Sequence, residues 1–297
     1  MIDVRYHIYS LAAVFFALAL GIVIGTSFAR RGPANESERR TITRYENSMR
    51  VFKRELELSA DSSAQKEIHI KNSEEFCRVI LPIVAKEMLQ WRYISIVQTG
   101  DYDDLSGSVK RALELAGGTV TNITDISRDF PFDDDHKVAE TLRSCYITPP
   151  SDNKAARDKL FSILSDAICG GKSAFLLPNL EKVGVIKFVG DRQNFVKVKL
   201  IVLVGGAESD EANTAESVDC RLLSKLENLG ITVVGCEGTD AVSSYIPAWH
   251  KMGIPTVDNA DSAIGQIAVI CALNGDKAKF GVKDTADRLI PQSLETK

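Results

Sequence analysis

The sequence predicts an α/β protein in three parts: an N-terminal transmembrane helix, a coiled-coil stalk, and a Rossmann-like α/β domain with a mostly parallel sheet. Three observations predict it: an uncharged apolar run near the N-terminus, a charged segment almost free of glycine and proline, and short apolar runs that alternate with helical stretches over the rest of the chain. We place the boundaries at residues 1–30 for the anchor, 31–90 for the stalk and 91–297 for the α/β domain.

The apolar run covers residues 8–28, IYSLAAVFFALALGIVIGTSF, and holds 21 residues without a charge. As an α-helix it is roughly 31 Å long, which matches a hydrocarbon core of about 30 Å. The alternative is a cleaved secretory signal, but the apolar part of such a signal usually has only about 7–15 residues. We therefore expect an uncleaved, single-pass anchor that contacts membrane lipid through these residues.

The charges that flank this run bear on the orientation of the chain. The N-terminal flank carries Arg5, whereas the C-terminal flank carries Arg30, Arg31, Arg39, Arg40, Arg44, Arg50, Lys53 and Arg54. The positive-inside rule keeps the more basic flank, and with it the large domain, in the cytoplasm. The six cysteines form no CxxC pair, which is typical of reduced, buried thiols. Both observations favour a cytoplasmic domain, and neither decides the side.

The segment after the anchor is predicted to be helical, because residues 36–89 contain one proline, Pro82, and no glycine. Apolar side chains recur there at alternating spacings of three and four, at Ile42, Tyr45, Met49, Phe52 and Leu56. That spacing is typical of an a/d seam, so we expect a coiled-coil homodimer through these five residues. The alternative is one amphipathic helix that folds back on its own domain.

The α/β domain is expected to begin with a buried strand at 93–98, which ends at Thr99-Gly100. A helix at 105–116 follows and is closed by Gly117-Gly118, since glycine adopts the left-handed conformation that ends many helices. The next expected elements are a strand at 119–123, helices at 137–145 and 152–169, and a strand at 173–177.

The second half of the domain starts with its most apolar strand, KLIVLV at 199–204, which ends in Gly205-Gly206. Ser209 is expected to cap the following helix, and Gly230 lies just past its end. The elements expected here are a helix at 209–229, a strand at 231–236, a helix at 241–252, a short strand at 256–257 and a helix at 261–273. This alternation predicts a mostly parallel sheet.

Composition and local motifs argue against two classes of function. The formal net charge is −4 without a global basic excess, so we expect no nucleic-acid binding. The sequence shows no local Ser/His/Asp or Cys/His motif, and we predict that the protein is not an enzyme. Gly170-Gly171-Lys172-Ser173 is not a phosphate-binding loop, because Asp166 stands where that motif has its first glycine and because a helix precedes it.

Few residues remain as candidates for a binding site, and no cofactor is evident from the motifs. Gly205-Gly206 follows a strand and precedes a helix, so backbone amides there could hold an anion, although we favour an ordinary βα turn. Asp101, Asp103 and Asp104 are expected to be solvated. His250 and Met252 are the one pair of possible Cu(I) ligands close in sequence; the alternative is a helix end that packs Met252.

Two parts of the chain carry a family resemblance. The first is MIDVRYH at residues 1–7, and the second comprises VDNAD at 257–261, GQIA at 265–268 and FGVKDTADRLIP at 280–291. Together they resemble the bacterial MctB family, which is named for copper transport in mycobacteria. The residues that stand out in these stretches are Arg5, Tyr6, His7, Asp258, Asp261, Gly265, Gly281 and Asp287.

The resemblance implies a role in copper transport or copper tolerance, copper as a ligand, and a place in the bacterial cell envelope. It leaves two hypotheses. The first is a copper-handling membrane protein with a Cu(I) site assembled in the fold from Cys, Met or His. The second is a membrane-tethered scaffold of envelope assembly or division that dimerises through residues 42–56 and binds an envelope or septal partner through its α/β domain.

Overall fold

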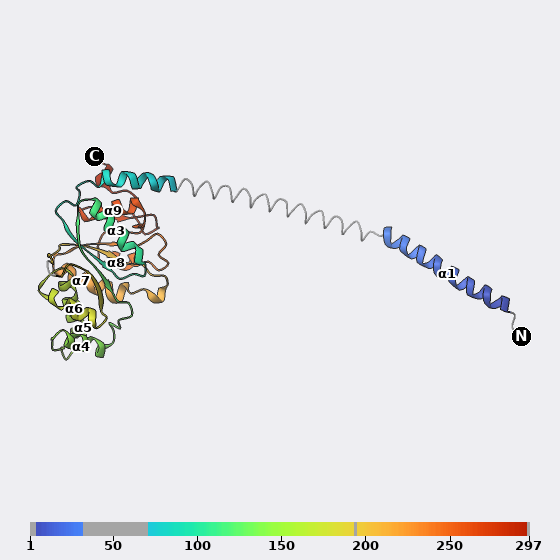
Figure 1. Ribbon diagram of the computed structural model, residues 1–297, viewed down its shortest axis with the longest axis horizontal. Coiled ribbons are helices and arrows are strands. Elements are labelled where there is room, and N and C mark those ends of the chain that lie inside the picture. Colours follow the sequence, from blue (N-terminus) through green and yellow to red (C-terminus); the bar gives the residue numbers. More distant parts are fainter. Residues whose placement is uncertain (1–3, 32–70, 193–194, 296–297) are drawn as a thin grey trace. The chain divides into compact units, whose positions relative to one another are not determined.

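The computed structural model describes residues 4–31, 71–192 and 195–295 (Figure 1). The chain divides into two compact units, residues 1–71 and residues 72–297. The first unit contains α1, and the second contains the α/β domain. The predicted dimer seam at Ile42, Tyr45, Met49, Phe52 and Leu56 lies outside the described residues.

The N-terminal apolar run forms α1, Val4–Arg31, as the sequence predicts. Its segment His7–Ser27 is long and apolar enough to cross a membrane. Within the unit the large apolar side chains of this segment are exposed, from 46% for Leu20 to 76% for Tyr9. An uncovered apolar surface of this length is stable in lipid rather than in water, which agrees with the predicted membrane anchor.

The second unit is built on one seven-stranded sheet with the order β3-β2-β1-β4-β5-β6-β7. All neighbouring strands are parallel except β2 and β3, which are antiparallel. The strands are β1 Tyr93–Gln98, β2 Thr119–Ile126, β3 Ile186–Gly190, β4 Leu200–Val204, β5 Thr232–Cys236, β6 Thr256–Val257 and β7 Lys279–Phe280. The mostly parallel α/β architecture is therefore confirmed.

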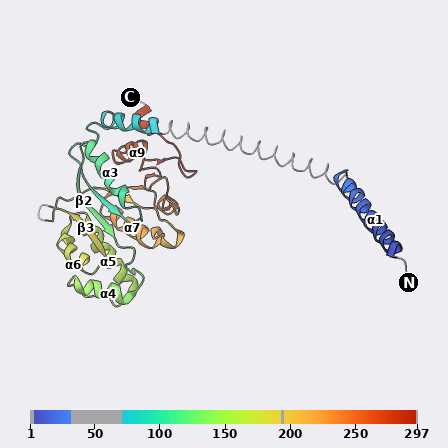
Figure 2. The same cartoon turned by 45° about the vertical axis from the view of Figure 1, so that its right-hand side comes forward.

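Helices cover both faces of this sheet, because the central strands are apolar on both sides. On one face α5, α7 and α8 pack against Ile201 and Leu203 of β4; on the other, α3 and α9 pack against Val202 and Val204. Figures 1 and 2 show α5 and α7 apart from α3 and α9. The helices are α3 Asp103–Leu115, α4 Asp135–Ser144, α5 Asn153–Ile168, α6 Leu177–Lys182, α7 Cys220–Asn228, α8 Ile246–Lys251, α9 Ala263–Leu273 and α10 Gln292–Glu295.

A further helix over residues 71–84 leads into the sheet. Leu81 and, just after it, Ala85 and Leu89 are buried in the same core cluster as α3 and α9. The end of the segment that we assigned to the stalk thus packs on the α/β domain, and the compact unit begins at Asn72.

The strand predicted at 173–177 is wrong. Residues Lys172–Leu176 form a 3-10 helix that leads into α6. The Asp166 carboxylate accepts the backbone N–H of Ser173 at 2.6 Å and so holds the chain in a tight turn after α5. Pro178 then lies in the first turn of α6, a position that its fixed backbone angle favours. The true edge strand, β3, follows later and was not predicted.

Two predicted helices are also shorter than expected. The helix predicted at 209–229 becomes a 3-10 turn at Asp210–Ala212, a π-helical turn at Ala215–Asp219, and then α7. The helix predicted at 241–252 begins only at Ile246, because Ser243 instead pairs with Ala207 in a β-bridge. Both irregular stretches lie after the carboxyl ends of central strands, β4 and β5.

Candidate functional site

The candidate site lies at the topological switch point of the sheet, between β1 and β4. β1 and β4 are parallel neighbours; the chain passes from β1 to β2 on one side and from β4 to β5 on the other. Ligands of open α/β sheets bind at the carboxyl ends of the strands at such a switch point. The loops after β1, β4 and β5 are therefore the first place to look for a site.

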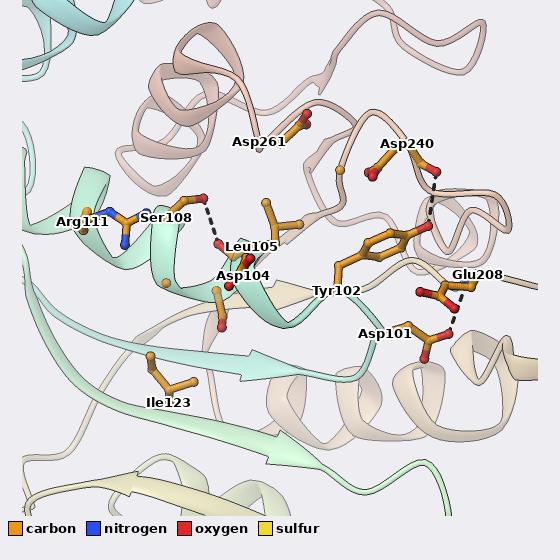
Figure 3. Close-up of a pocket in the computed structure, with 13 residues that line it drawn as sticks. Asp101, Tyr102, Asp104, Leu105, Ser108, Arg111, Ile123, Glu208, Asp240 and Asp261 are labelled. Atoms are coloured by element: carbon orange, nitrogen blue, oxygen red, sulfur yellow. Dashed lines mark hydrogen bonds between the residues drawn. The ribbon is translucent and has the colours of Figure 1, made fainter.

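A cavity of about 980 Å³ lies at this edge, between the start of α3 and the loops after β4, β5 and β6 (Figure 3). Its charged lining residues are Asp101, Asp104, Arg111, Glu208, Asp240 and Asp261. Five carboxylates and one guanidinium give the cavity an acidic lining. That lining favours cations and disfavours free anions.

The cavity wall is held together by hydrogen bonds between loops. The Tyr102 hydroxyl, from the loop after β1, donates to the Asp240 carbonyl oxygen at 3.2 Å and accepts the Val242 N–H at 3.4 Å. The Asp261 carboxylate accepts the backbone N–H and the hydroxyl of Thr239, at 2.8 and 2.9 Å. The loop after β5 is thus tied to its neighbours on both sides.

Asp219 is fully buried close to the switch point. One oxygen of its carboxyl group, Oδ2, accepts hydrogen bonds from Trp249 Nε1 at 2.8 Å and from the Thr99 hydroxyl at 3.2 Å. The other, Oδ1, has no hydrogen-bond partner among the described residues. Burial raises the pKa of Asp219 to about 7, and the two hydrogen bonds oppose that rise only in part.

Glu237, which directly follows β5, is also fully buried, but it has a cationic partner. Its Oε1 atom accepts from Lys283 Nζ at 2.7 Å and from the Ser244 hydroxyl at 2.7 Å. Its Oε2 atom accepts the backbone N–H of Tyr245 at 2.9 Å. This carboxylate joins the end of β5 to α8 and to the C-terminal segment.

The C-terminal signature residues have structural roles. The Asp258 carboxylate is fully buried and accepts the backbone N–H groups of Val282 and Lys283, at 2.7 and 3.0 Å. Gly281 has a φ of +147°, and a Cβ atom there would collide with the Asp258 carboxylate. Likewise, a Cβ atom on Gly265 would collide with the carbonyl group of Asn259. Asp258 and Gly281 thus fix the segment that places Lys283 against Glu237.

The N-terminal signature residues belong to the other unit. Arg5, Tyr6 and His7 all lie in the first turns of α1, and His7 is exposed there. The structure therefore does not bring together the two halves of the signature within one unit.

The predicted pair of copper ligands is divided between two environments. His250 Nε2 lies 2.8 Å from the Thr256 hydroxyl, and burial, followed by the nearby charge of Lys279, lowers the pKa of the imidazole. Met252 instead packs against the core cluster of α5, α7 and α8. The signature residue Asp287 lies beside His250, where both line a small cavity of about 170 Å³.

The other possible soft ligands are cysteines, and all six are free. Burial raises the pKa values of Cys145, Cys220 and Cys236, and it raises that of Cys169 to about 12. A raised pKa disfavours the thiolate that binds metal ions. Within the residues that the structure describes, no group of three or more His, Cys, Asp or Glu side chains could hold a metal ion.

The expectation that Asp101 is solvated is wrong. Its side chain is only 7% exposed and is ion-paired with Arg128. Asp219, Glu237 and Lys283 were not predicted as site residues at all. Arg128 lies 27 positions from Asp101, Lys283 lies 46 from Glu237, and Thr99 lies 120 from Asp219. No local spacing indicates these contacts.

Comparison with known proteins places this chain in a family. The family model described as "Copper transport outer membrane protein, MctB" matches residues 1–291. The protein named "Copper transporter MctB" of Mycobacterium tuberculosis H37Rv is 26% identical over 306 residues, which cover 92% of each chain. That of Mycobacterium leprae is 26% identical over 329 residues, 98% of this chain and 100% of its own. With α1 as its candidate membrane span, this chain is a membrane-associated protein of the cell envelope and belongs to the MctB family.

Proposed function

We propose that the protein acts in copper transport or copper homeostasis at the cell envelope, held in the membrane by α1. The observation that carries this proposal is the family match over residues 1–291, which includes both the apolar helix and the α/β domain. Relatives aligned over 92% or more of this chain are named copper transporters. Their names give the scaffold hypothesis no support.

The α/β domain, in this proposal, is not an enzyme and does not store copper in its core. The buried cysteines have raised pKa values, and the cavity at the switch point is lined by carboxylates, which suit hard cations rather than Cu(I). We propose that this domain instead recognises a partner, and that residues 42–56 pair two copies as a coiled coil beside the membrane.

A copper-tolerance assay with anchor variants tests the proposal. A strain that lacks the gene is expected to stop growing at a lower copper concentration than its parent, with zinc as the control metal. The wild-type gene and Leu18→Ile should restore tolerance. Leu18→Arg should not, because an arginine at the centre of a membrane helix costs about 2.5–3.5 kcal/mol of insertion free energy. Equal copper tolerance of the parent and the deletion strain would contradict the proposal.

A further inference from the structure

The crevice expected at the switch point is closed by the chain itself. The backbone N–H groups of Thr99 and Asp101 donate to the carbonyl oxygens of Val204 and Gly206, at 2.9 and 3.0 Å, so the loops after β1 and β4 continue the pairing of the two strands. A Cβ atom on Gly100 would lie 2.5 Å from the backbone of Gly205. These loops leave no space between them for a ligand phosphate.

The Asp101 carboxylate lies at the same point. Its Oδ2 atom accepts the backbone N–H of Glu208, in the loop after β4, at 3.1 Å (Figure 3). Its Oδ1 atom is paired with the guanidinium group of Arg128, which follows β2. The Asp101 side chain is 7% exposed. Three loops, after β1, β2 and β4, thus converge on one nearly buried negative charge.

The donors around Asp101 are those that recognise anionic ligands. A guanidinium group and a backbone N–H form strong charge-assisted hydrogen bonds to phosphate and carboxylate oxygens. We infer that Asp101 is a built-in anion, which occupies an anion subsite formed by Arg128 and the Glu208 N–H and excludes free phosphate from it. The Asp101 carboxylate thereby fills the subsite without a ligand.

The surrounding charges act in the same direction. Asp104, Glu208, Asp240 and Asp261 line the adjoining cavity, where Arg111 is the one basic residue among the described residues of the lining. An anion that approached Arg128 from this side would meet a net negative field. The Asp101 side chain therefore supplies the negative charge of the subsite from within the chain. The four neighbouring carboxylates repel free anions.

The test uses the full-length protein in detergent micelles and inorganic phosphate as the probe. Phosphate binding is measured by calorimetry, and the melting temperature is followed as a function of phosphate concentration. We expect no saturable binding to the wild type. Asp101→Ala should melt at a lower temperature, bind phosphate saturably, and regain melting temperature as phosphate is added.

Two further variants separate a specific subsite from a general change in charge. The double variant Asp101→Ala/Arg128→Met should lose the phosphate response. Asp104→Ala removes an exposed carboxylate of the same cavity that repels anions without filling the subsite, so it should change the phosphate response far less than Asp101→Ala. Saturable phosphate binding by the wild type would overturn the inference, and so would an unchanged response in the double variant or the lack of any response in Asp101→Ala. If Asp101→Ala does not fold, Asp101→Ser, which also shortens the side chain and removes its charge, takes its place under the same criteria.

Discussion

Asp219 and Glu237 are two fully buried carboxyl groups at the same end of one sheet, and they differ in the charge of their hydrogen-bond partners. Glu237 has an ammonium group at 2.7 Å, a hydroxyl and a backbone N–H. Asp219 has two neutral donors, both on the same oxygen. Burial of a charge is costly unless a counter-charge compensates it. Glu237 is stabilised by a cation, and Asp219 by retaining its proton up to about pH 7.

The largest expected effect is on the ion pair. Lys283→Met should destabilise the domain by about 3–5 kcal/mol, because it leaves the Glu237 carboxylate buried without its cation. The double variant Lys283→Met/Glu237→Gln should recover much of that loss. Urea unfolding of the full-length protein in micelles measures both. Lys277→Met, at an exposed lysine near the same segment, is the matched control, and an equal loss in that control would refute the assignment.

The next effect concerns the dependence of stability on pH. The pKa of Asp219 is raised in the folded state to about 7 from an ordinary value of 3.8, so the folded state binds the proton more tightly than the unfolded chain. The contribution of Asp219 to stability is then greatest at low pH, falls as the pH rises from about 4 to 7, and is constant above that range. Between pH 5 and pH 7 the loss should be on the order of 2–3 kcal/mol.

Asp219→Asn should flatten this dependence, since an amide does not ionise. Its free energy of unfolding is measured by urea titration at several pH values. It should exceed that of the wild type above pH 7, and between pH 5 and pH 7 it should change less than that of the wild type. A wild-type slope that survives the substitution would show that another group is responsible.

A smaller effect is expected at the turn that positions Lys283. Gly281→Ala requires a left-handed backbone for alanine and brings its Cβ atom against the Asp258 carboxylate, so the cost should be about 1–3 kcal/mol. Gly253→Ala is the control, because Gly253 also has a positive φ, but a Cβ atom there would meet no described atom within 4 Å. Thermal melts of the two variants should differ, and identical melting temperatures would exclude the contact with Asp258.

The smallest effect should come from a surface ion pair. Lys251 and Glu216 are 2.7 Å apart, but both side chains are largely exposed, at 69% and 76%. Solvent screens such pairs. Lys251→Ala should therefore leave the urea midpoint unchanged, whereas a shift comparable with that of Lys283→Met would erase the distinction between buried and exposed partners.

The parts of the fold that the sequence predicts well are those with strong local patterns. The uncharged run at residues 8–28 predicts α1, and the apolar runs at 93–98 and 199–204 predict β1 and β4. The strand predicted at 173–177 fails because its apolar residues pack through a 3-10 helix. The two-residue β7 has too short a pattern to detect.

The site was much harder to predict, because its contacts join distant residues. Lys283 is 46 positions from Glu237, and Thr99 is 120 positions from Asp219. The family resemblance singled out Asp258 and Gly281, but only the fold shows that one carboxylate and one glycine together hold the segment that carries Lys283. Local spacing carries no information about which buried acid receives a cation and which keeps a proton.

The copper content of cells tests the proposed function most directly. Cells that lack the gene, cells with the wild-type gene restored and cells with Leu18→Arg are exposed to the same copper concentration, and copper, zinc and iron are measured per cell by elemental analysis. The account predicts higher copper in the deletion and Leu18→Arg strains, unchanged zinc and iron, and a return to the parental level with the wild-type gene. Equal copper content in all of these strains would contradict a role in copper transport.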